Sequence, residues 1–439
     1  MVAGLRPDGE TRWRAGCRAV LLVLLVAVPV VFDTSVRPAF ALPKFTVVAL
    51  GAVLVAGLAA VGHLVARRSP SRRRANGLGV AVLALLGWTA VSAVASDDPG
   101  TALVGARESL DGFVTLAALV TLFFAVSWSF DRSHVRTALA VLWFGGAGPV
   151  LLYAAVQLRD RVAGGGGWDP VAWRNWPGDD AIWSTLGNPN HLAGFLAVLL
   201  PVGVVLLVVG RSAAARALTA AMLVLLLVVV LVVASRGALL GGVVALAALA
   251  VWFRHQVRDR WRSVLLAGGG LAAVAAALTA VVAWSGHVER GGDELLRTGE
   301  GTTVALRLEL WKTAWRIAED NPVVGVGPDR FGASFDEFRS DRFVDVYGPD
   351  LLATDPHNVF LSHLATRGFP GLLTYLLVVV SAAVRLGRPG QRGPKSADGS
   401  VHERVDEEGA VLAAVAGALL AYLCQASFNR HEITLDLCF

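Results

Sequence analysis

The 439-residue chain contains little cysteine and little charge. Its cysteines, Cys17, Cys424 and Cys438, are too few and too scattered for a disulfide framework, so we predict no structural disulfide. Charged residues make up 17% of the chain, and no basic stretch carries interleaved aromatic residues. We therefore expect neither a water-soluble core nor nucleic-acid binding. No internal repeat or inverted pair of broken spans is visible, which weighs mildly against a transporter built from two halves.

The chain instead has long apolar runs. Hydrophobic residues make up 55% of it and the mean hydropathy is +0.59, and the runs are long enough to cross a bilayer as helices. We predict an all-α, polytopic membrane helix bundle of about 11 spans. Nine of them fall in residues 1–284, a polar loop follows at 285–356, and the last two lie in 357–439 around a linker at 385–408.

The positions of the basic residues predict the orientation. Positively charged flanks resist translocation, so segments rich in Lys and Arg belong in the cytoplasm. The N-terminus and the linker at 385–408 are then cytoplasmic, and the loop at 285–356 is extracytoplasmic. The first apolar run, which is followed by Ala39-Phe40-Ala41, also fits a cleaved signal peptide, and this alternative stays open. Of the 39 basic residues, 22 lie in segments 1–18, 67–76, 131–136, 211–216, 254–262 and 385–408.

The 72-residue loop at 285–356 carries most of the polar chemistry. It holds 14 acidic against 8 basic residues, so any anion site in it must be local. Within it, the apolar spacing of Thr303–Asp320 predicts an amphipathic helix that Asn321-Pro322 ends. We expect its apolar stripe to lie on the outer membrane surface or to pack on the bundle. The stripe consists of Val304, Leu308, Trp311, Trp315 and Ala318.

Four polar clusters lie at the outer face in this topology. Two of them open or join spans, one belongs to the large loop, and one leads from the loop into the next span. In chain order they are Gly187-Asn188-Pro189-Asn190-His191; Ser235-Arg236-Gly237; Arg307 and Trp311 with the run Asn321-Pro322-Val323-Val324-Gly325-Val326-Gly327; and Asp355-Pro356-His357-Asn358 with Arg367-Gly368-Phe369-Pro370-Gly371.

Together these clusters resemble the O-antigen ligase and O-antigen polymerase superfamily of bacterial membrane glycosyltransferases. That superfamily has a large extracytoplasmic loop and a motif of the form His-(Asn/Ser/Gln)-x9-Gly-x-x-Gly. Here His357-Asn358, nine residues, Gly368 and Gly371 satisfy the spacing, and the other clusters look like family features in the same order. The resemblance implies a GT-C-like fold. It also implies a further, twelfth span in a full-length relative, after the position where this chain stops.

The resemblance also implies a function. Members of the superfamily move a glycan from undecaprenyl pyrophosphate to a hydroxyl of lipid A-core, of a polysaccharide or of a protein. We therefore expect an O-antigen ligase-like transfer, metal-independent and inverting, without a cofactor, at the outer face of the bacterial cytoplasmic (inner) membrane. An O-antigen or exopolysaccharide polymerase is the alternative within the superfamily. The expected partners are the lipid-linked donor, the acceptor and membrane lipid, with no nucleic acid.

Three arginines are candidates for binding the pyrophosphate. The leaving group gains charge as the glycosidic bond breaks, and the always-charged guanidinium fork suits phosphate oxygens. We predict pyrophosphate binding by Arg236, Arg307 and Arg367, with a catalytic role for Arg307 as well. Each has a plainer interpretation: Arg236 as a side chain snorkelling to the headgroups, Arg307 as part of a solvated helix face, and Arg367 as an interfacial anchor.

His357 is the candidate catalytic base, because an acceptor hydroxyl must lose a proton and histidine titrates near neutral pH. The alternative is a structural or capping histidine. No metal site is expected, since His363 is six residues on, off the helical face of His357, and no second carboxylate has ligand spacing. Substrate-orienting roles are expected for Asn190, His191, Asn358 and Trp311.

These assignments require Arg236, Arg307 and His357 to line one outward-facing cleft that is also open to lipid, with the helix at 303–320 over it. A transporter, the alternative from another class, should bury ionisable residues near the bilayer midplane. The predicted spans hold almost none there, so the pattern favours an enzyme.

Overall fold

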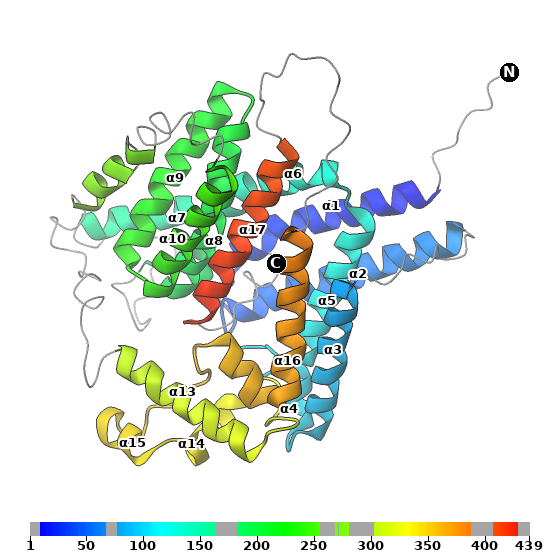
Figure 1. Cartoon of the computed structure of the whole chain (residues 1–439), viewed down its shortest axis with the longest axis vertical. Coiled ribbons are helices and arrows are strands. Elements are labelled where there is room, and N and C mark those ends of the chain that lie inside the picture. The colour runs from blue at the N-terminus through cyan, green and yellow to red at the C-terminus, as the bar shows by residue number, and fades with distance from the viewer. Residues whose placement is uncertain are drawn as a thin grey trace. The chain divides into compact units, whose positions relative to one another are not determined.

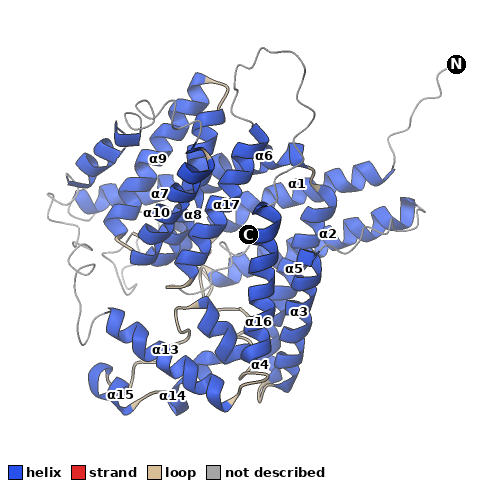
Figure 2. Ribbon diagram, viewed as in Figure 1, coloured by secondary structure: helices blue, strands red, loops and turns tan. Residues whose placement is uncertain are grey.

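The computed structural model describes residues 9–66, 77–163, 182–254, 268–270, 272–280, 303–387 and 407–428. Every regular element in these ranges is a helix, which confirms the all-α prediction (Figure 2). Residues 285–302 of the large loop, most of the predicted linker and Cys438 lie outside the described residues. The chain forms two compact units: unit 1 takes Met1–Leu142 and Ala305–Ala382, and unit 2 takes Trp143–Val304 and Ala383–Leu435.

The described helices are those of a multi-pass membrane protein. Eight of them are long and apolar enough to cross a membrane. Three shorter apolar helices, Phe113–Ser129, Arg236–Trp252 and Gly268–Ala280, coincide with further spans expected from the sequence. A span of fewer than about 18 residues is short for a bilayer. The predicted total of about 11 spans therefore requires that these three helices cross the membrane together with flanking residues.

In unit 1, α1 packs along α2, and both pack against α5, which also contacts α3. Lys44, at the start of α2, is buried and donates from Nζ to the carbonyl of Val28 at 2.8 Å. The side chain thus covers a carbonyl that the end of α1 leaves without a helical partner. The membrane helices of this part are α1 (Gly9–Val30), α2 (Ala41–Ala66), α3 (Gly77–Ala95) and α5 (Phe113–Ser129), with the shorter α4 (Pro99–Val104) and α6 (Arg132–Ala140).

Unit 2 is built around α8. This helix contacts α9, α10 and α17. Of its most apolar 18-residue stretch, 78% is buried, the largest share of any described span. Its sequence is apolar on all sides, as expected of a helix surrounded by others. The elements are the π-helical segment Val141–Ala147, α7 (Gly148–Val162), the short 3-10 helix Ser184–Leu186, α8 (Pro189–Val209), α9 (Ala213–Val233), α10 (Arg236–Trp252) and α17 (Glu407–Ala426).

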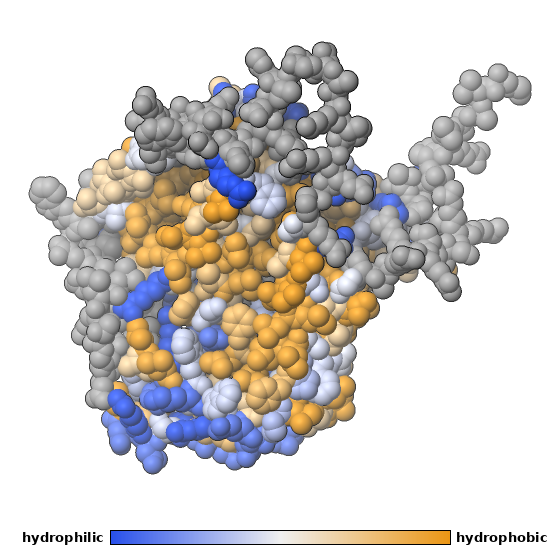
Figure 3. Space-filling view, in the orientation of Figure 1, coloured by the Kyte–Doolittle hydropathy of each residue, from blue (hydrophilic) through white to orange (hydrophobic). Residues whose placement is uncertain are grey.

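The described part of the large loop folds as three helices, α13 (Thr303–Asp320), α14 (Phe331–Phe338) and α15 (Asp341–Tyr347). Hydrophilic side chains cover these helices in Figure 3, in contrast to the apolar helices of the same unit. The loop then leads into α16 (Val359–Gly387), which runs beside α3 and α5 in Figure 1. Inside the loop, one apolar cluster joins the three helices to α16: Leu310, Ala314, Ile317, Phe331, Phe335, Phe343 and Ala365.

Helix α13 has the bounds expected from the sequence, but the predicted stripe is only partly buried: Ala318 is 1% exposed and Trp311 is half-buried. Leu308 and Trp315 are 48% and 47% exposed, whereas Leu310 and Ile317 are almost fully buried. The helix has apolar residues on two faces, and the one that faces the aromatic residues of α14 and α15 is packed. Periodicity alone could not choose between the two faces, because the partners of the second face follow later in the chain.

Candidate active site

Two of the sequence motifs meet backbone to backbone in unit 1. After α13 ends, the Asn-Pro-x-x-Gly-x-Gly run at 321–327 crosses α16 where that helix is broken. We call this contact the interlock. Three hydrogen bonds hold it: from the N–H of Val326 to the carbonyl of Ala365 (3.1 Å), from Gly327 to Thr366 (2.9 Å) and from Phe369 to Pro322 (2.9 Å).

Glycine is required on both sides of the interlock. Gly368 has φ 68° and ψ −174° inside α16, a conformation that side chains disfavour, and a Cβ there would overlap the carbonyl of Val323. Gly325 has φ 66°, and a Cβ there would overlap the backbone of Thr366. Helix α16 is therefore broken at Gly368, and Gly325 and Gly368 allow the close approach of the two backbones.

Three side chains of α3 complete the interlock. Trp88 donates from Nε1 to the carbonyl of Arg367 at 2.7 Å, and Ser96 donates from Oγ to that of Val326 at 2.8 Å. The hydroxyl of Ser92 lies 2.7 Å from the carbonyl oxygen of Val324 and also within bonding distance of Thr366. None of these three residues was predicted from the sequence. Their signal was a spacing of four, which places polar groups on one face of an apolar helix.

His357 lies on a constrained turn directly before α16. Its φ is 54°, which is uncommon for a residue other than glycine, and its N–H donates to Oδ1 of Asp355 at 2.6 Å. Asn358 caps α16, since its Oδ1 accepts from the N–H groups of Phe360 (3.0 Å) and Leu361 (3.1 Å). Capping thus falls to Asn358, while the His357 side chain is half-buried beside a helix N-terminus, where anions are favoured.

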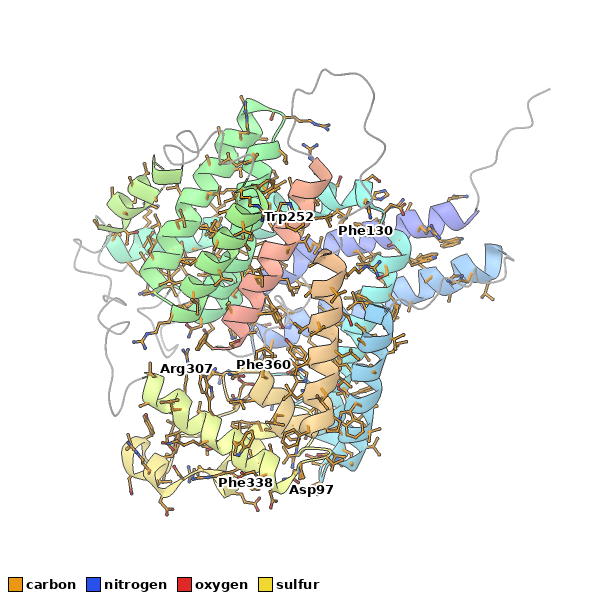
Figure 4. The ribbon with its side chains drawn as sticks, viewed as in Figure 1. Asp97, Phe130, Trp252, Arg307, Phe338 and Phe360 are labelled. Carbon is orange, nitrogen blue, oxygen red and sulfur yellow. The ribbon has the colours of Figure 1, made fainter. Side chains whose placement is uncertain are left out.

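Helix α13, which carries Arg307, shares an apolar core with the start of α16. Its neighbour Leu306 and Leu361 of α16 both pack against the apolar cluster of the loop. Figure 4 shows Arg307 near the first turns of α13 and Phe360 near the start of α16. Trp311 lies one helical turn after Arg307 and is half-buried. The fold of unit 1 thus gathers two of the four clusters predicted from the sequence.

Arg367 lies inside unit 1. It is 5% exposed, and its Nη1 donates to Oγ1 of Thr366 at 3.1 Å and lies 3.5 Å from Nδ1 of His363. The His363 ring is stacked on Tyr375 at 4.2 Å. An interfacial anchor should reach the headgroups, so that interpretation does not fit this burial. A pyrophosphate would likewise have to enter the interior of the unit to reach this guanidinium.

The other two clusters meet at one end of unit 2. Asn188 caps α8 by accepting from the N–H of Asn190 at 2.8 Å, which places Asn190 and His191 in the first turn of that helix. One turn on, Ala193 packs with Ala238 of α10, close to Arg236 in the sequence. Both Asn190 and Arg236 are half-buried. The predicted common cleft joins residues of both units and stays a prediction.

A cavity of about 270 Å³ lies within unit 1. Thr101, Ser109, Asp329 and Thr354 are among its lining residues. None of the candidate site residues lines it. In the described ranges, no group of three or more His, Cys, Asp or Glu residues could hold a metal ion.

Comparison with known proteins identifies one family. Residues 221–376 match the family described as O-Antigen ligase, which confirms the resemblance to the O-antigen ligase-like superfamily. The matched segment includes Arg236, the interlock motifs and His357, but not α3 or the start of α8. No curated protein matches the chain.

Proposed function

We propose that this membrane protein is an O-antigen ligase-like glycosyltransferase. It moves a glycan from undecaprenyl pyrophosphate to an acceptor hydroxyl at the outer face of the cytoplasmic membrane. The family match from 221 to 376 supports the superfamily and with it a lipid-linked glycan and an acceptor as partners in general. The donor lipid, the acceptor hydroxyl and the inverting course are the proposed parts.

The observation that carries the proposal is that α13, which carries Arg307, and α16, which begins next to His357, pack on one apolar cluster. Leu306 precedes Arg307, Leu361 follows His357 by four residues, and both leucines pack on the same apolar cluster. The interlock fixes the two chain segments further along. A cation and a proton acceptor on jointly held elements suit a reaction in which a phosphate leaves and a hydroxyl is deprotonated.

In the proposed reaction, the acceptor oxygen attacks the anomeric carbon from the side opposite the pyrophosphate. The new carbon–oxygen bond forms as the bond from that carbon to the phosphate oxygen breaks, so the configuration inverts. The acceptor proton passes to the imidazole of His357. The electron pair of the broken bond leaves with undecaprenyl pyrophosphate, whose charge Arg307 and Arg236 stabilise in the way that a metal ion does in other transferases.

Asn190, His191 and Trp311 have orienting roles in this proposal. Asn190 and His191 lie in the first turn of α8, at the same end of unit 2 as Arg236. Trp311 lies one turn from Arg307 and offers an indole to a sugar ring. Asn358 acts through its helix cap and fixes the turn of His357, so a direct contact of its Oδ1 with substrate is not part of the proposal.

The test is glycan transfer by the purified protein in proteoliposomes that contain an undecaprenyl-pyrophosphate-linked glycan. Mass spectrometry of the acceptor detects the product. His357→Ala should abolish transfer while the protein still accumulates in membranes at a near-normal level. His63→Ala is the matched control, because His63 lies at the end of α2 against Trp128. Normal turnover of His357→Ala would remove this residue from the mechanism.

Two alternatives are separated by the same preparation. A polymerase would extend the lipid-linked glycan itself, so its product keeps the undecaprenyl pyrophosphate and grows by whole repeats. A transporter would move substrate across the vesicle membrane without forming a glycosidic bond. One observation favours the transporter, namely the burial of His363 and Arg367 within the apolar helix α16. Substrate flux without glycan transfer would overturn the proposed function.

A further inference from the structure

Helix α3 lies outside the segment that matches the family, yet it holds the interlock in place. Trp88, Ser92 and Ser96 follow one another at intervals of four, so they lie on one face of the helix. Ser92 is fully buried and Ser96 nearly so. Each donates to a carbonyl oxygen of the interlock, at 2.7 to 3.0 Å. We call these three residues the α3 ladder.

The carbonyls that the α3 ladder reaches include two that α16 cannot serve. In an unbroken helix, the carbonyl of Thr366 would accept from the N–H of residue 370, but that residue is Pro370 and has no N–H. The carbonyl of Arg367 precedes Gly368, where the helix is broken. Bare carbonyls are costly in a setting with little water. The N–H of Gly327 donates to the carbonyl of Thr366, and Ser92 and Trp88 supply further donors at the break.

Ser92 connects both sides of the interlock. Its hydroxyl lies within bonding distance of Val324 on the loop run and of Thr366 on α16. A hydroxyl has a single hydrogen, which the two carbonyls share. Loss of this group leaves one carbonyl on each side less well satisfied, so the register of the loop run against α16 depends on it.

A second set of contacts extends the docking beyond α3. The carboxylate of Asp329 accepts from the N–H groups of Ala106 (2.7 Å) and Asp111 (3.0 Å) and from Ser109 Oγ. Arg330 donates to Asp98 at 3.1 Å. The large loop is thus hydrogen-bonded both to helix α3 and to the segment that follows it, from residue 92 to residue 111.

We propose that Trp88, Ser92 and Ser96 are positioning residues for the transfer reaction. They touch no reacting atom. They hold residues 321–327 against the break in α16. This fixes the segment that follows α13, the helix of Arg307, relative to α16, which begins beside His357. This inference rests on the proposed function for its catalytic part, and on the hydrogen bonds of unit 1 for its structural part.

The test compares Ser92→Ala with Thr89→Val in the full-length protein in nanodiscs. Thr89 is the matched control: it is equally buried on α3, but its hydroxyl donates to Leu85 of its own helix. Trp88→Phe is the second test variant, because it keeps the ring and removes only the indole N–H. Hydrogen exchange by mass spectrometry follows the amides of Val326, Gly327 and Phe369, which close the interlock.

In Ser92→Ala and Trp88→Phe, these amides should exchange about fivefold faster or more, the size expected for one lost hydrogen bond. In Thr89→Val they should exchange as in the wild type. Turnover per correctly folded molecule, measured on the monodisperse fraction, should fall about tenfold in the two test variants and stay unchanged in the control. A role limited to folding yield would reduce the amount of folded protein and leave turnover per folded molecule intact.

Unchanged exchange at 326–327 and 369 in both test variants would overturn the inference. Faster exchange with undiminished turnover per folded molecule would overturn it as well, since the interlock would then have no bearing on the reaction. Failure of the proposed function is distinct from both, because the wild-type protein itself would transfer no glycan. In that case the exchange data alone decide whether the α3 ladder holds the interlock.

Discussion

The backbone N–H of Gly327 donates to the carbonyl of Thr366 at 2.9 Å, so the last glycine of the loop run is bonded two residues before the break in α16. This contact assigns different tasks to the parts of the two motifs. Gly325 and Gly368 permit the two backbones to approach, and Gly327 leaves room for the Ser96 side chain, whereas Arg307 and His357 retain side chains suited to chemistry. Substitutions of the glycines should therefore change the stability of the fold, whereas substitutions of Arg307 and His357 should change glycan transfer.

Gly368→Ala should destabilise the fold more than Gly348→Ala. Both glycines have positive φ with ψ near 180°, so each substitution adds about 1–3 kcal/mol of backbone strain. A Cβ at Gly348 meets nothing, whereas one at Gly368 overlaps Val323 and adds about 1–3 kcal/mol more. Thermal unfolding of the detergent-solubilised variants measures the difference. Equal unfolding temperatures would show that the close backbone approach is not present in solution.

The helices could be predicted from the sequence, but the contacts that hold them together could not. The apolar runs predicted helices because a segment that spans a bilayer must satisfy its backbone hydrogen bonds internally, as a helix does. The bounds of α13 were predictable because Asn321-Pro322 ends that helix. The buried face of α13 was not, since its partners Phe335 and Phe343 belong to helices that periodicity in 303–320 cannot locate.

The candidate site was predictable to a similar degree. The motif around His357 could be recognised from spacing alone, but the cap formed by Asn358 and the burial of Arg367 depend on where α16 breaks and what packs there. Ser92 was not predicted, because a single serine in an apolar run gives no sign of the carbonyl that it will meet more than 200 residues later.

Arg307→Lys should reduce glycan transfer about tenfold or more, because lysine keeps the charge but cannot form the two parallel hydrogen bonds of a guanidinium to phosphate. Arg316→Lys is the control on the same helix, since Arg316 is exposed and donates to the carbonyl of Phe338. Initial rates in the reconstituted assay, normalised to folded protein, measure the effect. An unchanged rate for Arg307→Lys would favour a solvated surface role.

Acid should weaken the large loop through Glu309. Burial raises the pKa of this carboxyl, but hydrogen bonds from Lys312 (2.7 Å) and Ser340 (2.9 Å) lower it by more, so its pKa lies below its ordinary value. A lowered pKa in the folded state stabilises the fold above the unfolded pKa of about 4.3, and this stabilisation is lost as the pH falls through the folded pKa.

Glu309→Gln should therefore lower the unfolding temperature at pH 7 and reduce its dependence on pH between about 5 and 3. Glu337→Gln, at an exposed position of α14, is the control and should leave that dependence as in the wild type. Thermal scans at a series of pH values test both variants. The same acid sensitivity in Glu309→Gln and the wild type would place the titrating group elsewhere.

The proposed topology predicts which cysteines a membrane-impermeant thiol reagent can reach in whole cells. Glu337→Cys lies on exposed α14 in the large loop and should be labelled, whereas Ala214→Cys, exposed at the start of α9, should be labelled only after lysis. The background variant should lack Cys17, Cys424 and Cys438. The reverse pattern would move the large loop, and His357 with it, to the cytoplasm.

Arg236 and Arg307, two of the arginines proposed to bind pyrophosphate, give a test of whether they act on one substrate. Arg236 belongs to α10 of unit 2 and Arg307 to α13, which lies in unit 1 from Ala305 onward. If both bind the same leaving group, the free energies lost in Arg236→Lys and Arg307→Lys should not add in the double variant, because the first loss already weakens what the second arginine contributes. We expect a departure from additivity of at least about 0.5 kcal/mol in the activation free energies calculated from kcat/KM. Arg236→Lys combined with Arg316→Lys is the control pair and should be additive.

Strict additivity of the first pair would mean that Arg236 and Arg307 meet different groups. The proposed site would then consist of Arg307 and His357, and Arg236 would have the role of a side chain that snorkels to the headgroups.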